Sequence, residues 1–122
     1  MIERYSSDKH RNKISRWLAE RNIECPDDED FCDFGLVVDD LVAGFLYKTN
    51  SKLCYLDDFV SDPDGDPTAK SEAWQKLISA LEEEAKSSGY KYITASVNHP
   101  NLLVAFKNYG LVGDCRRFVK SL

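Results

Sequence analysis

Residues 53–97 read LCYLDDFVSDPDGDPTAKSEAWQKLISALEEEAKSSGYKYITASV, and they carry the clearest structural pattern in the chain. A run of strand-like composition, 53–60, opens it, and a second such run, 90–97, closes it. Between the two runs, apolar side chains recur at helical spacing, at Trp74, Leu77, Ile78, Leu81 and Ala85. Gly89 suits the residue that follows a helix C-terminus. A strand, a helix and a further strand in this order predict a β-α-β unit.

The linker between the first strand and the helix, residues 61–68, holds two prolines and a glycine, which predicts irregular structure throughout it. Before the unit, 34–38 and 41–47 are β-rich runs, and the dipeptide Asp39-Asp40 between them predicts a tight hairpin turn. Together with 53–60 these runs predict an antiparallel meander.

Each end of the chain adds further elements. N-cap residues at positions 6–8 precede an apolar helical pattern, so a helix is predicted from about residue 8 to 22, and residues 2–5 are a candidate short strand. Near the C-terminus, a short helix is predicted from Pro100 through Phe106, followed by a strand over 116–119. The whole chain, 1–122, is therefore predicted to be one α/β domain with a mixed (α+β) sheet, an antiparallel meander followed by β-α-β-α-β.

Composition narrows the classes of function. Hydrophobic residues make up 43% of the 122 residues and the net charge is -5, which suits a globular domain and disfavours general nucleic-acid binding. No apolar run approaches a membrane span and the N-terminus is polar, so a cytoplasmic location is expected. The cysteines form no C-x-x-C pair, which predicts free thiols and no metal site.

The element order resembles the GNAT superfamily of acyl-coenzyme A N-acyltransferases over nearly the whole chain. YLDDFVSDP (55–63) is similar to the fourth strand of that family and the turn that leaves it. SEAWQKLISALEEEAKSSG (71–89) is similar to the helix whose N-terminus holds the pyrophosphate. YKYITASVNHPNLLVAFKNYGLV (90–112) is similar to the fifth strand, the following helix and the glycine-hydrophobic ending. Short GNAT-like proteins of tailed bacteriophages look most similar.

The resemblance implies acetyl transfer from acetyl-coenzyme A to a primary amine by direct attack. Strands four and five of the family part, the pantetheine arm pairs with backbone in the gap, and the pyrophosphate binds at the next helix N-terminus. The coenzyme A positions implied are Phe59, Val60, Ala69, Lys70, Ser71, Glu72, Asn98 and Asn101. Asp57 stands where several members carry a glutamate, which makes it the candidate general base.

The predicted phosphate-binding loop departs from the family pattern. That pattern reads Gln or Arg, two residues, Gly, one residue, and Gly or Ala. One register puts Ala69 first; the preferred one puts Lys70 first and Ala73 at the first glycine, and neither supplies a glycine for close phosphate approach. Acidic residues at 62, 64 and 66 also add negative charge beside the pyrophosphate site, so coenzyme A is expected to bind less tightly than in typical members.

The candidate acid also departs from the family. Phe106 stands where many members carry a tyrosine that protonates the leaving thiolate. A second hypothesis is therefore open, in which a GNAT-fold protein has lost coenzyme A chemistry and binds or inhibits a protein target.

Two acidic segments carry weaker predictions. The acidic run 27–30 lies where the family places its acceptor loop, and it either attracts a cationic amine or is a solvated loop. The alternating carboxylates at 62, 64 and 66 suggest calcium, but Pro67 and Ala73 occupy the positions where an EF-hand loop needs Gly and Glu. A surface turn without metal is the prediction there.

Overall fold

The structure, a computed structural model, describes residues 1–25, 27, 34–96, 107, 108, 112, 113 and 117–122. Within this part of the chain, seven strands form one mixed sheet in the order β1-β2-β3-β4-β5-β7-β6. The strands are β1 (Ile2–Arg4), β2 (Phe34–Val38), β3 (Val42–Tyr47), β4 (Leu53–Ser61), β5 (Tyr92–Ser96), β6 (Val112–Gly113) and β7 (Arg117–Ser121). The helices are α1 (Ser7–Ala19) and α2 (Pro67–Ser87).

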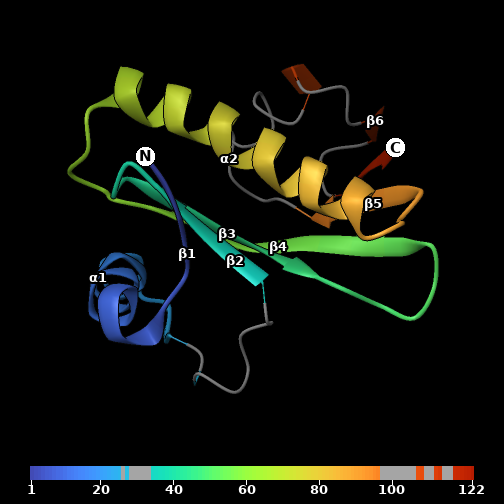
Figure 1. Ribbon diagram of the computed structural model, residues 1–122. Helices are drawn as coiled ribbons and strands as arrows, with labels where there is room; N and C mark the ends of the chain where they lie inside the picture. The colour runs from blue at the N-terminus through green and yellow to red at the C-terminus, as the bar shows by residue number, and fades with distance from the viewer. Residues whose placement is uncertain (26, 28–33, 97–106, 109–111, 114–116) are drawn as a thin grey trace.

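The two helices lie on opposite faces of the sheet (Figure 1). Between α2 and the sheet lies the larger core, which includes Leu46, Leu56, Leu77, Ile78, Leu81 and Ile93. Between α1 and the sheet lies a smaller core of Ile14, Trp17, Val37, Ala43 and Val60. Because both faces are covered, the β2–β3 hairpin is apolar along almost its whole length.

The hairpin turn predicted at Asp39-Asp40 is confirmed. Both residues have positive φ, 53° and 54°, as a type I′ turn requires. The Asp39 carboxylate binds the N-terminal ammonium of Met1 and the side-chain ammonium of Lys76. These hydrogen bonds hold the pKa of Asp39 below 3.8. The turn thereby fastens the N-terminus and α2 to the hairpin.

A β-bulge interrupts the pairing of β3 with β4. Their register shifts between Ala43 and Phe45, so two residues of β4, Asp58 and Phe59, stand opposite the single residue Gly44. Asp58 has a φ of 56°, in the left-handed region that Asp tolerates better than most residues. The bulge therefore bends β4 close to the predicted base, Asp57.

Several boundaries differ from the sequence prediction. α1 ends at Ala19, where a Schellman motif begins: Asn22 N–H bonds to the Ala19 carbonyl and Ile23 N–H to the Leu18 carbonyl. α2 begins at Pro67, inside the segment predicted to be irregular, because proline fits the first helical position.

At the C-terminal end, β7 is Arg117–Ser121 rather than 116–119, and β6 was not predicted because two residues carry no readable strand period. The short helix predicted from Pro100 to Phe106 lies outside the described residues.

Cys54 is a buried thiol on β4, and burial raises its pKa to about 11. Because the thiolate is the reactive form, we expect a disulfide reagent at about pH 8 to modify Cys54 only in the unfolded chain. Wild type and Cys54→Ala should show equal thiol titres in native buffer and differ by one equivalent in guanidinium. A fast-reacting native thiol that is missing in Cys54→Ala would contradict this burial.

Candidate functional site

β4 and β5 pair along only part of β4. The parallel register joins residues 53–56 to residues 92–95, whereas β4 continues to Ser61. Among the described residues, β4 pairs beyond Leu56 with β3 alone. Within the described ranges, the backbone of 57–61 thus has no strand paired on its β5 side, and an extended ligand can pair with such an edge as an added strand.

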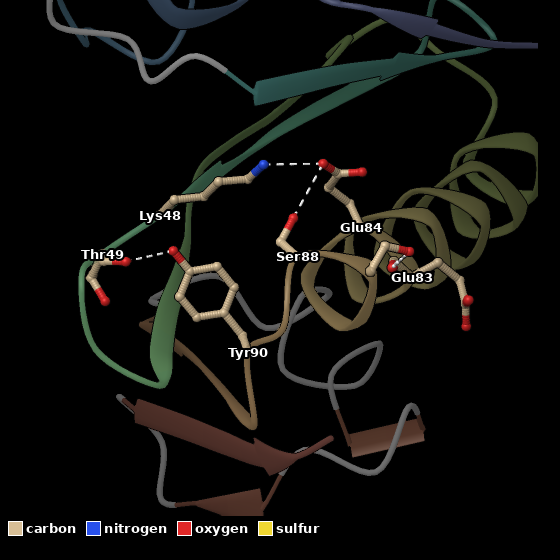
Figure 2. Close-up of polar contacts among 7 residues, drawn as sticks. Lys48, Thr49, Glu83, Glu84, Ser88 and Tyr90 are labelled. Atoms are coloured by element: carbon tan, nitrogen blue, oxygen red, sulfur yellow. Dashed lines mark hydrogen bonds and ion pairs between the residues drawn. The ribbon is translucent and has the colours of Figure 1, made fainter.

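The other end of this strand pair is tied together by polar contacts (Figure 2). The Lys48 ammonium lies 3.1 Å from the Glu84 carboxylate of α2, which also accepts the Ser88 hydroxyl at 3.5 Å. The Tyr90 hydroxyl donates to the Thr49 carbonyl at 2.6 Å. These contacts fasten the end of α2 and the approach to β5 onto the β3–β4 turn, so the two strands are held together at this end.

Phe59 and Val60, both predicted to lie along the coenzyme A arm, belong to different faces of the sheet. The Val60 side chain is buried in the core under α1. Phe59 packs edge-to-face on Trp74 of α2, with ring centroids 5.9 Å apart. The Phe59 ring also covers Gly44, where an added Cβ would lie 2.8 Å from it. Phe59 therefore packs over β3 and against α2.

Asp57 and Asp58 form a carboxylate pair at the bulge. Asp57 is exposed, and its Oδ1 accepts the backbone N–H of Asp58 at 2.8 Å. Asp58 is half-buried, and the Tyr47 hydroxyl donates to its Oδ2. Tyr47 is the cross-strand partner of Tyr55, which is 43% exposed. Asp58 therefore lies with the tyrosines that β3 and β4 carry on one face of the sheet.

Asp58 is electrostatically unusual. Burial raises its pKa above 3.8 and the neighbouring Asp57 charge raises it further, while the Tyr47 hydrogen bond lowers it. A carboxyl with a raised pKa binds protons more readily in the folded chain than in the unfolded one. Folding stability therefore falls as pH rises through the window between 3.8 and the folded pKa. Asp58 opposes stability at neutral pH, which is typical of functional carboxyls.

The N-terminus of α2 is more occupied than the sequence predicted. Asp66 is the N-cap, and its carboxylate accepts the Ala69 N–H at 2.9 Å. The Lys70 N–H bonds to the Asp66 carbonyl at 2.9 Å, and Pro67 has no N–H. The Asp66 carboxylate thus occupies the Ala69 N–H that was predicted to bind pyrophosphate, and it adds a negative charge at that point. In this turn, the backbone N–H of Thr68 is the group left for a ligand.

The next predicted positions follow on α2. Lys70 Nζ donates to the Asp62 carbonyl at 3.0 Å and so closes the preceding loop. The side chains of Ser71 and Glu72 are exposed. Glu72 also lines a shallow depression of about 590 Å³ between the outer side of α2 and Ile2. The residues that line this depression include none of β4 or β5, so it is separate from the edge of β4.

Some predicted positions lie outside the described residues, namely Asn98, Asn101, Phe106 and residues 28–30. In the 62–66 loop, Asp62 Oδ1 accepts the Asp64 N–H at 2.9 Å, so this carboxylate serves the turn. Across the described ranges, no three His, Cys, Asp or Glu side chains are arranged to hold a metal ion. Nor does that part of the chain contain a helix long and apolar enough to cross a membrane.

Two site residues escaped the sequence analysis, Tyr47 and Arg21. The Arg21 guanidinium donates to the Ser61 carbonyl at 2.8 Å, the Ser61 hydroxyl at 3.1 Å and the Trp17 carbonyl at 3.0 Å. It thus places a cation where β4 ends. Neither residue had a local signal, because each meets β4 through the tertiary fold rather than through spacing along the chain.

Comparison with known proteins gives matches of structure only: no family model matches the chain, and no curated protein matches it by sequence. A proposed acyl-CoA N-acyltransferase from Klebsiella pneumoniae superposes with a TM-score of 0.77 at 13% identity, over 100% of this chain and 97% of that one. A GNAT-family acetyltransferase from Staphylococcus aureus gives 0.73 at 12%, over 100% and 98%. Neisseria gonorrhoeae N-acetylglutamate synthase, complexed with coenzyme A and N-acetyl-glutamate, gives 0.66 at 14%, over 100% and 35%. This chain therefore has the fold of the GNAT acetyltransferases.

Proposed function

We propose that this protein binds acetyl-coenzyme A between β4 and β5 and transfers the acetyl group to a primary amine. The pairing of β4 carries the proposal, because among the described residues β4 continues to Ser61 after its pairing with β5 has ended at Leu56. A pantetheine arm is extended and carries amide groups, so it can pair with the edge of residues 57–61. The gonococcal synthase, which shares the fold, is complexed with coenzyme A.

The chemistry needs a base more than it needs an acid. An alkyl ammonium has a pKa of about 10.4, so it must lose a proton before its nitrogen attacks the thioester. A thiol has a pKa of about 8.5, so the thiolate leaves at neutral pH without a tyrosine acid. A carboxylate of β4 is the proton acceptor, and the two candidates are Asp57, to which the sequence resemblance points, and its neighbour Asp58.

One observation favours a second function. The carboxylate of Asp66 occupies the Ala69 N–H, and the ammonium of Lys70 is held by the Asp62 carbonyl. Both groups are therefore engaged before any pyrophosphate arrives. A GNAT-fold protein that binds or inhibits a protein target needs no pyrophosphate site, so this arrangement suits it.

Acetyl-coenzyme A binding separates the two functions. We expect 1 mM acetyl-coenzyme A to raise the melting temperature by roughly 10 °C, because ligand at about 100 times its Kd adds about 2.7 kcal/mol of stability. Titration calorimetry should give a Kd of roughly 10 μM. Absence of both a thermal shift and a heat of binding would overturn the acyltransferase proposal and favour the protein-binding function.

The variant Asp66→Ser tests where the pyrophosphate lies. Serine still caps the helix, so stability should change by less than about 0.5 kcal/mol, while the carboxylate charge is removed. Acetyl-coenzyme A should then bind roughly 3- to 10-fold more tightly, since a carboxylate about 8 Å from a phosphate costs about 2 kcal/mol before salt screening. Asp64→Ser, which removes a loop charge outside the cap, is the matched control and should gain less. Equal affinity in all three proteins would place the pyrophosphate elsewhere.

A further inference from the structure

We infer that Asp58, and not Asp57, is the general base of the proposed transfer, and that Tyr47 is the residue that positions its carboxylate. The inference rests on the proposed function. It starts from one contact between neighbouring strands: the Tyr47 hydroxyl of β3 donates to Oδ2 of Asp58 on β4. The carboxylate of Asp57 instead accepts the backbone N–H of Asp58 and is otherwise exposed to solvent.

The β-bulge between β3 and β4 sets the orientation of Asp58. In a regular strand, neighbouring side chains point to opposite faces, but Asp58 has a φ of 56° and stands with Phe59 opposite one residue of β3. Asp58 follows Leu56, the last β4 residue paired with β5, by two positions. Its half-buried carboxylate therefore lies just beyond the last described β4–β5 pair, beside the stretch of β4 along which we propose that the thioester binds.

The proton and bond changes balance with Asp58 as the base. The carboxylate takes one proton from the substrate ammonium and becomes a neutral carboxyl. The freed nitrogen forms a bond to the thioester carbonyl carbon, and the carbon–sulfur bond breaks with its electron pair left on sulfur. The amide nitrogen releases its second proton to solvent, and the coenzyme A thiolate departs. Asp58 then loses its proton to solvent.

The surroundings of Asp58 suit proton acceptance better than those of an exposed carboxylate. Among the described residues, the titratable groups that act on it are Tyr47 from β3 and Asp57 from β4. Burial and the Asp57 charge make its carboxylate more basic, while the Tyr47 hydroxyl keeps it ionised and oriented. The two neighbours act in opposite directions, so removing each of them should move the titration of Asp58 in opposite directions.

The test is the pH dependence of kcat/KM in wild type, Asp58→Asn, Asp57→Asn and Tyr47→Phe, with acetyl-coenzyme A and either a polyamine or a lysine peptide. Asparagine tolerates positive φ and can still accept the Tyr47 hydroxyl, so Asp58→Asn should fold. We expect Asp58→Asn to lose about 100-fold or more in kcat/KM, with the Kd for acetyl-coenzyme A within about twofold of wild type. Asp57→Asn should stay active, and the rise of its kcat/KM on the acidic side of the pH profile should move to lower pH. In Tyr47→Phe the same rise should move to higher pH.

Carbon-13 NMR of the Asp58 carboxyl supplies a readout that needs no turnover. Its titration should move to higher pH in Tyr47→Phe and to lower pH in Asp57→Asn. If wild type acylates an amine while Asp58→Asn is as fast and Asp57→Asn is inactive, the inference is overturned and the proposed function stands. If wild type neither binds acetyl-coenzyme A nor acylates either amine, both are overturned. If the Asp58 carboxyl titrates as in wild type in both Tyr47→Phe and Asp57→Asn, Tyr47 does not position it.

Discussion

Replacing Gly35 with alanine is expected to lower the free energy of unfolding by about 3 kcal/mol, at the upper end of the usual effect of overpacking. A Cβ on Gly35 would lie 2.4 Å from Cε1 and 2.5 Å from Cδ1 of Phe45, and 3.1 Å from Cβ of Tyr5. Phe45 is completely buried, and its ring packs edge-to-face on Tyr5 at 5.2 Å. A rigid ring held in this way has no free space to enter, so the β2–β3 pairing must shift instead.

The same contact predicts strong non-additivity. Phe45→Ala alone should lower the free energy of unfolding by about 3–5 kcal/mol, because it leaves a cavity over Gly35. With the ring gone, Gly35→Ala should become nearly neutral. In urea unfolding, the double variant should therefore be about 1–3 kcal/mol more stable than the sum of the two single losses predicts. Gly35→Ala with Leu81→Ala, a buried residue of α2 on the other face, is the control and should be additive. Additivity in the Phe45 pair would contradict the packing described for this face.

Much of the fold could be predicted because it follows from local patterns. The apolar spacing of Trp74 to Ala85 identified α2, and Asp39-Asp40 identified the hairpin turn, since both signals need only residues near one another in the chain. The bulge at Asp58 could not be predicted. It depends on the fit of the Phe59 ring over Gly44, and these residues are separated by a turn and a strand.

The candidate site, like the fold, could be predicted only in part. The resemblance led to β4 and to its Asp57-Asp58 dipeptide, but regular alternation along a strand gave no reason to choose Asp58, since the bulge that turns it was unknown. The missing glycines of the phosphate loop were visible in the sequence. That Asp66 would cap α2 through the Ala69 N–H was not, because the helix was expected to begin after Pro67 rather than at it.

Replacing Gly44 with alanine is expected to damage the site as well as the fold. A Cβ on Gly44 would lie 2.8 Å from the Phe59 ring and 3.1 Å from the Leu77 side chain. Phe59 cannot move easily, because its ring also packs edge-to-face on Trp74. The strain should lower the free energy of unfolding by about 1–3 kcal/mol and should be relieved in part by rearranging the bulge. We therefore expect acetyl-coenzyme A to bind about tenfold more weakly, a loss of about 1.4 kcal/mol.

Gly35→Ala is the matched control for this prediction, because it makes the same chemical change in the neighbouring strand but presses on Phe45 instead of Phe59. It should destabilise the protein at least as much, yet the folded fraction should bind acetyl-coenzyme A within about twofold of wild type. Adding Phe59→Leu to Gly44→Ala replaces the rigid ring with a flexible side chain and should recover stability. Calorimetry below the melting temperature of each variant separates affinity from folding. If both glycine variants bind equally well, the bulge does not shape the ligand edge of β4, and its only role is to accommodate Phe59 over β3.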